Sequence, residues 1–138
     1  MITEDYISFE TAKLLKEKGF DEPCFRYAES KEIYERGDWM VANVTGGAVG
    51  VPTLQMARKW IKEKYNRHIE VRITNHSISD MVNVIKYYWI IFDAKTARWM
   101  DESTIYKTGA FDTEEQAYEN AFRHILENIE NYDENIER

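Results

Sequence analysis

Thiol and imidazole groups, the side chains best suited to nucleophilic and zinc chemistry near neutral pH, are scarce in this sequence. They are one cysteine, Cys24, and three histidines, His68, His76 and His124. A single cysteine allows neither an intrachain disulfide nor a multi-cysteine zinc site, and no two histidines stand four residues apart as in a metalloprotease helix. We therefore predict no catalytic, metal or cofactor site and interpret Cys24 as a small buried residue. A Cys24–histidine pair brought together by the fold is the nucleophilic alternative.

The glycine-rich segment at residues 45–51 lies between a predicted strand and a predicted helix, where phosphate-binding loops also lie. A Walker loop has Gly-Lys-Ser/Thr at the start of its helix, whereas this chain has Val51-Pro52-Thr53 there. Proline has no backbone N–H to offer a phosphate. We interpret the segment as a flexible loop that leads into the helix.

The sharpest candidate for an interaction site is the amphipathic helix predicted at residues 54–65. Arg58, Lys59 and Lys62 lie on its polar arc, and Trp60 lies near the edge of that arc. Basic and aromatic side chains on one stripe can bind nucleic acid. However, the net charge is −7, all of it from residues 112–138, which hold nine acidic and two basic residues. We therefore favour a solvated face that pairs with the acidic C-terminal helix of this molecule or of a neighbour.

Aromatic residues make up 14% of the chain, with four Trp, nine Tyr and six Phe. This exceeds what three helices and one sheet need for a core, and Tyr and Trp are enriched at protein interfaces. We expect part of a binding surface to come from the following residues: Trp39, Trp60, Tyr87, Tyr88, Trp89 and Trp99.

Capping signals and periodicity predict the elements that position these residues. Ser8 as N-cap and Gly19 as the left-handed C′ residue delimit a first helix, in which Phe20 should contact Leu15. Further helices are predicted at residues 54–65 and from residue 112 or 113 onward. Strands are predicted at residues 24–27, 33–34, 39–44, 68–74, 82–92 and 98–106, with residues 82–92 as the central strand because both of its faces are apolar.

This order, α-β-β-β-α-β-β-β-α, predicts an α+β protein with three helices on one mostly antiparallel sheet of about four to six strands. We expect a single domain over residues 1–131, followed by an acidic tail or helix extension at residues 132–138. The last helix carries an apolar stripe that continues to Tyr132 and Ile136. These two residues would extend beyond the domain, so order should end near Asn131 in a monomer, or the helix should pair antiparallel in a dimer.

Three blocks resemble a family of small uncharacterised proteins from gut Bacteroides genomes and their phages. They are ITEDYISFETAKLLKEKGFDEPCFRY (2–27), VPTLQMARKWIKEKYNRHIEV (51–71) and FDTEEQAYENAFRHILENI (111–129). Family members share an "ISFETAKLLKEKGF" opening, a central "PTLQMAxKWL" helix and a closing "EEAxxxAxxxxLENL" helix. Arg58 stands where many relatives have an apolar residue. The resemblance implies a shared fold and a mobile-element origin, and it brings no catalytic residue.

The predicted location is the cytoplasm. The opening MITEDYISFE has acidic residues where a secretory signal has basic ones. The longest apolar stretch, residues 87–92, is too short to span a bilayer.

We expect a non-enzymatic accessory protein of phage or mobile-element type that binds an unknown protein, with a homodimer also considered and no membrane partner. The alternative is a nucleic-acid-binding module that uses the helix around residues 58–67, and the third candidate is a small hydrolase or transferase. The predicted interaction surface comprises Arg58, Lys59, Trp60, Lys62, Trp99, Tyr132 and Ile136.

Overall fold

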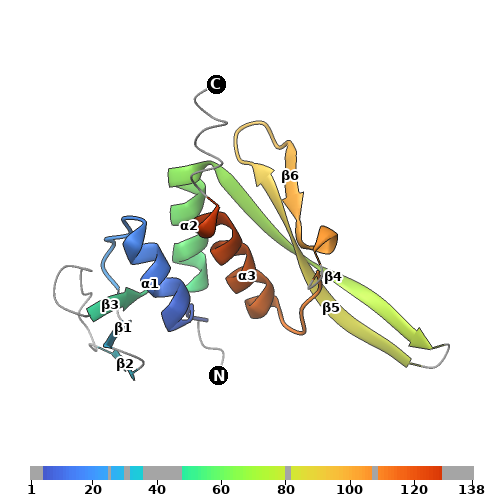
Figure 1. The fold of residues 1–138 in the computed structure, drawn as a ribbon, viewed down its shortest axis with the longest axis horizontal. Coiled ribbons are helices and arrows are strands. Elements are labelled where there is room, and N and C mark those ends of the chain that lie inside the picture. Colours follow the sequence, from blue (N-terminus) through green and yellow to red (C-terminus); the bar gives the residue numbers. More distant parts are fainter. Residues whose placement is uncertain are drawn as a thin grey trace. The chain divides into compact units, whose positions relative to one another are not determined.

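The computed structural model describes residues 5–24, 26–29, 32–35, 48–79, 82–106 and 109–128. In these residues the helices α1 (Phe9–Glu17), α2 (Leu54–Tyr65) and α3 (Glu114–Glu127) alternate with six strands in the predicted order (Figure 1). A short 3-10 helix, η1 (Ser103–Ile105), precedes α3. The α+β class is therefore confirmed. The predicted boundary at residue 131 lies outside the described residues.

The described strands form two antiparallel sheets of three strands rather than one larger sheet. The first has the order β2-β1-β3, from β1 (Arg26–Glu29), β2 (Glu32–Glu35) and β3 (Ala48–Val51). The second has the order β4-β5-β6, from β4 (Arg67–Ser79), β5 (Val82–Asp93) and β6 (Trp99–Glu102). The chain has two compact units, residues 1–60 with 123–138 and residues 61–122, which we call the first and second units and describe separately.

One local prediction was wrong, because residues 48–51 form strand β3 and not a flexible loop. Val49 and Val51 are both buried, and the glycine between them lies opposite Tyr27 of β1. Two valines that alternate with small residues fit a pleated strand with one buried face, and tertiary pairing outweighs the low strand propensity of glycine. The strand predicted at residues 39–44 lies outside the described residues.

Helix α1 begins and ends as its capping residues predict. The Thr11 backbone N–H donates to the Ser8 hydroxyl at 3.3 Å. At the other end Gly19 has a φ of 101°, and the Phe20 N–H donates to the Leu15 carbonyl at 2.9 Å. This is the six-to-one bond of a Schellman motif, and both apolar side chains are buried. Glycine takes this left-handed conformation at no steric cost.

In the second unit β5 is the central strand, as predicted, and β4 and β6 lie at its two sides. A tight turn joins β5 to β6, and the Asp93 carboxylate accepts the N–H groups of Lys95 and Thr96 at 2.9 and 3.0 Å. The hydrogen bond from Thr96, and next that from Lys95, hold the pKa of Asp93 below its ordinary value. The Asn66 side chain also donates to Asp93 at 3.0 Å, which ties the start of β4 to this turn.

Trp89, in the middle of β5, is only 1% exposed and has partners for both of its N–H groups. Its backbone N–H donates to the Ser103 hydroxyl of η1 at 3.1 Å, and its indole N–H donates to the Asn120 side-chain oxygen of α3 at 2.9 Å. The ring centroid of Tyr106 lies 6.2 Å from that of Trp89. One buried side chain thus links the central strand, the loop after β6 and the last helix.

We predict that Asn120→Leu lowers the free energy of unfolding by about 1–3 kcal/mol, because the buried Trp89 indole N–H loses its acceptor. Urea denaturation followed by circular dichroism measures this change. In a Trp89→Phe background, which has no indole donor, the same substitution should cost much less. An equal cost in both backgrounds would show that the hydrogen bond does not fix α3 on the sheet.

The loop after β6 returns to its own start at Gly109. The Ser103 hydroxyl donates to the Gly109 carbonyl at 2.7 Å. A Cβ atom at residue 109 would lie 2.7 Å from the Ser103 carbonyl oxygen and 2.9 Å from the Thr104 Cα. Both of these are backbone atoms, so the loop itself would have to move to make room.

Gly109→Ala should therefore destabilise the protein by about 1–3 kcal/mol, the usual cost of overpacking. Thermal denaturation of the variant beside Thr104→Ala, an exposed change in the same loop, is the measurement. The control should stay within about 0.5 kcal/mol of the wild type. Wild-type stability for Gly109→Ala would mean that the close approach is not needed.

Candidate interaction surface

Large apolar side chains are exposed on the second unit. Among the described residues five are 44–62% exposed, and all five belong to this unit: Ile73, Ile85, Trp99, Ile105 and Tyr106. Single exposed apolar residues are ordinary on protein surfaces, whereas neighbouring ones indicate a binding surface. Their positions in the sheet therefore show whether any of the five are neighbours on one surface.

Two of the five lie side by side on the β4–β5 hairpin. Ile73 pairs with Tyr87, and Asn75 pairs with Ile85, so the two isoleucines are diagonal neighbours on one face. Val71 and Trp89, the next pair along the hairpin, lie on the same face. That face is covered by α3 at Trp89 and becomes exposed beyond it. We call Val71, Ile73, Ile85 and Tyr87 the apolar patch.

The outer end of the hairpin extends past the rest of its sheet. Strand β6 pairs only with residues 90–92 of β5, whereas β4 and β5 remain paired out to residues 79 and 82. Figure 1 shows this end of β4 and β5 as a two-stranded ribbon that continues beyond β6. We call residues 73–85 the arm. Seven residues of strand at about 3.3 Å each give it a length of roughly 23 Å.

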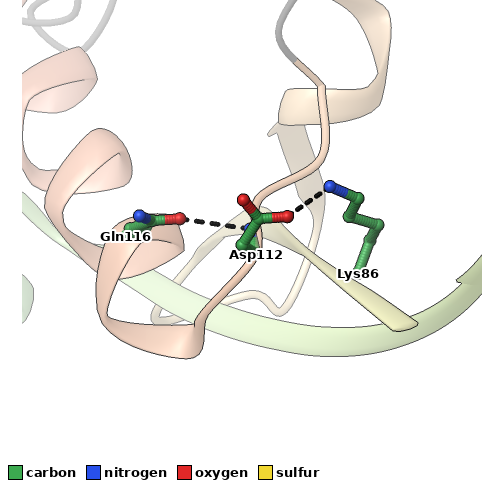
Figure 2. A network of polar contacts seen from close by, with 3 residues as sticks. All are labelled: Lys86, Asp112 and Gln116. Atoms are coloured by element: carbon green, nitrogen blue, oxygen red, sulfur yellow. Dashed lines mark hydrogen bonds and ion pairs between the residues drawn. The ribbon is translucent and has the colours of Figure 1, made fainter. Parts of the chain in front are cut away.

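The arm is held at its base by the segment that leads into α3. Tyr87 and Phe111 exchange two backbone hydrogen bonds of 2.8 and 2.7 Å. Beside them, Lys86 forms an ion pair with Asp112, whose backbone N–H donates to the Gln116 side chain (Figure 2). The sequence allowed a capping box at residue 112 or 113. The structure uses Thr113, which accepts the Gln116 N–H at 3.1 Å.

The opposite face is polar on β4, whereas on β5 it includes the buried Ile90. The Arg72 guanidinium donates to the Glu70 carboxylate at 2.7 Å, and both side chains are partly exposed. Hydrogen bonding to Glu70, and next to Tyr88, raises the pKa of Arg72 above its ordinary value. Beyond this pair, residues 73–85 contain one charged residue, Asp80. A surface with no lysine or arginine offers little attraction to phosphate groups.

The described residues of the predicted interaction surface lie on two elements, α2 and β6. Trp99 is exposed, and Lys59 and Lys62 are exposed on α2, where Arg58 is half-buried. The half-buried Trp60 packs edge-on against Phe20, with ring centroids 5.4 Å apart. Tyr132 and Ile136 lie outside the described residues.

Trp89, expected among the surface aromatics, is instead buried, because α3 and the loop after β6 both cover it. Sequence reasoning missed Ile73 and Ile85 as surface residues, because alternation marks which residues share a face and not how far the covering helix reaches. The alternation of β4 offered no signal, because its apolar residues end at Ile73 and positions 75 and 77 hold Asn and Ser. No feature of the sequence indicated that Ile105 and Tyr106 are exposed, because both lie within the strand predicted at residues 98–106.

Cys24 is buried, and its thiol lies 3.4 Å from the Glu22 carbonyl oxygen, to which it donates. Burial, with a smaller contribution from the Glu22 charge, raises the pKa of the Cys24 thiol from 9.0 to about 11. A nucleophilic cysteine needs the opposite shift. No group of three or more His, Cys, Asp or Glu residues that could hold a metal ion occurs among the described residues.

No helix in the described part of the chain is both long and apolar enough to cross a membrane. Comparison of the chain with models of known families, with curated proteins and with solved structures finds no match. The resemblance to the Bacteroides and phage family therefore stays a prediction.

We predict that Cys24 reacts with iodoacetamide at pH 8 about 100-fold more slowly in the folded protein than in urea, since only the thiolate is nucleophilic. Mass spectrometry of timed samples gives the two rates. The raised pKa of Cys24 also predicts a change of stability with pH, because the unfolded thiol ionises near pH 9 and the folded thiol near pH 11. As the pH rises from about 9 to about 11, the free energy of unfolding of the wild type should therefore fall relative to that of Cys24→Ala. Rapid alkylation of the folded protein would restore the nucleophilic alternative.

Proposed function

We propose that this protein is a non-enzymatic accessory protein, of the phage or mobile-element type that the resemblance implies, and that it acts by binding another protein. The observation that carries the proposal is the exposure of Ile73 and Ile85 as neighbours on an arm with one charged residue. Partner proteins favour such contiguous apolar surface, which loses water on association.

The length of the arm supports this proposal. An isolated two-stranded ribbon is at best marginally stable in water, and an arm gains nothing for its own core by leaving two isoleucines exposed. A partner that covers the apolar patch would bury this surface and also stabilise the outer strand pairs. Exposed Trp99 and Tyr106 offer further aromatic contact area on the same unit.

The composition of the arm favours protein over nucleic acid as the partner. Hairpin arms that enter a DNA groove or follow a phosphate backbone need basic residues. The alternative is nucleic-acid binding by α2, whose exposed lysines Lys59 and Lys62 are accompanied by Arg58. No observation on the arm supports that alternative.

The test is site-specific photo-crosslinking in cells of the organism that carries the gene. A benzophenone amino acid at Ile85 should form discrete adducts with another protein chain, identified by mass spectrometry. The same probe at Lys95, an exposed residue of the β5–β6 turn, is the matched control and should form none. Adding Ile73→Thr to the Ile85 probe should reduce the adducts at least fivefold, because the patch loses a neighbouring side chain.

Equal adducts at both positions, or none at Ile85, would contradict the proposal. The nucleic-acid alternative is checked separately by electrophoretic titration with DNA and RNA at low salt, where electrostatic affinity is greatest. A mobility shift that Arg58→Glu with Lys62→Glu abolishes would establish that alternative instead.

A further inference from the structure

The apolar patch continues the face of the sheet on which α3 lies. Trp89, the next apolar residue along that face, donates its indole N–H to Asn120 of α3 at 2.9 Å. Helices packed on one face of an antiparallel sheet are the usual layers of an α+β protein. A helix from a partner, placed beside α3, would extend the helical layer over the patch.

The spacing of the two exposed isoleucines suits such a helix. Ile73 and Ile85 are 62% and 57% exposed and are diagonal neighbours on the β4–β5 hairpin. Diagonal neighbours on a sheet have Cβ atoms up to about 7–8 Å apart. Side chains three and four residues apart on a helix are about 5–6 Å from each other. One apolar stripe with this helical spacing can therefore contact both isoleucines.

Carboxylates lie at the base of the arm, where α3 begins. Figure 2 shows Lys86 of β5, Asp112 and Gln116 of α3 joined in one chain of polar contacts. Residues 109–122 contain four acidic residues and neither lysine nor arginine. Three of the four are exposed, and we call them the acidic rim: Asp112, Glu114 and Glu115.

The acidic rim lies close enough to the patch to act on whatever occupies it. Phe111 is paired with Tyr87 of the patch. Each further residue adds at most about 3.8 Å, so the Cα atoms of Glu114 and Glu115 lie within about 11 and 15 Å of that of Phe111. The Debye length is about 10 Å at 0.1 M salt and longer at lower salt. The rim therefore attracts basic groups beside the patch and repels acidic ones.

We infer that the partner docks on the apolar patch through an amphipathic helix whose apolar stripe is flanked by lysine or arginine, placed beside α3 and next to the acidic rim. This inference rests on the proposed function and names the chemistry of the partner. Apolar contact supplies the affinity, and the rim selects among apolar helices by charge.

Two labelled peptides of about 15 residues test this inference, because that length can form a helix. Both have leucines at i, i+3, i+4 and i+7; the basic probe has lysine and glutamine elsewhere, and the acidic probe has glutamate in place of each lysine. Fluorescence anisotropy at about 50 mM salt gives the affinities for the full chain. The basic probe should bind at least roughly tenfold more tightly than the acidic one. Equal binding of the two probes would overturn the inference.

Threonine substitutions show whether the basic probe uses the patch. Ile85→Thr should weaken its binding at least roughly fivefold, because the patch loses an apolar side chain. Ile105→Thr is the matched control, since Ile105 is 62% exposed on the same unit but lies outside the patch. It should change the affinity less than about twofold. Basic-probe binding that Ile85→Thr leaves unchanged would be general attraction to an acidic protein and would contradict docking on the patch.

Charge reversal shows whether the rim selects the partner. Glu115→Lys should weaken the basic probe at least roughly threefold and strengthen the acidic probe by a similar factor. Glu63→Lys, on an exposed residue of α2 in the same unit, makes the same change of net charge and should alter both affinities less than about twofold. Carboxylates in a first helical turn also stabilise the helix. A purely structural effect of Glu115→Lys would weaken both probes, and that result would refute selection by the rim.

The cross-linking experiment at Ile85 separates this inference from the proposed function. Adducts with an acidic segment of another protein, or with a second copy of this chain, would overturn the basic helix and leave protein binding standing. No adduct at Ile85, beside probes that behave as stated, would overturn the proposed function in cells. It would leave the binding chemistry of the patch and the acidic rim established.

Discussion

The buried indole of Trp89 is the constraint on which the second unit depends. A tryptophan at this depth must find an acceptor for its ring N–H, because an unsatisfied donor costs more than the hydrogen bond itself contributes. Asn120 supplies that acceptor from α3, while Ser103 accepts the backbone N–H and so fixes the loop after β6. Helix, loop and central strand are therefore joined at a single residue.

The position of Trp89 also marks where α3 stops covering the apolar face of β4 and β5. Helix α3 reaches the sheet at Trp89, and the segment that precedes this helix pairs with β5 through Phe111 and Tyr87. Beyond this point β4 and β5 stay paired out to residues 79 and 82, and the apolar residues Ile73 and Ile85 have no helix over them. Ile73 and Ile85 are exposed for this reason.

Each altered pKa among the described residues has a structural cause. The thiol most suited to nucleophilic attack is buried, and burial raises its pKa when activation would require a lower one. The ionisable groups with altered pKa values on the second unit, Asp93 and Arg72, each have a local structural cause in a turn and in an ion pair. The shifts of Asp93 and Arg72 therefore follow from hydrogen bonds within the hairpins.

The sequence by itself determined what depends on neighbours along the chain. Ser8 and Gly19 set the limits of α1 because caps act within one helical turn, and residues 82–92 were recognisable as a central strand because both faces are apolar. Tertiary structure decided the rest. Strand β3 forms because β1 lies beside it, and the six strands divide between two sheets. Trp89 is buried and Ile85 exposed because burial depends on which distant segment covers a face, and alternation along one strand carries no information about where that cover stops.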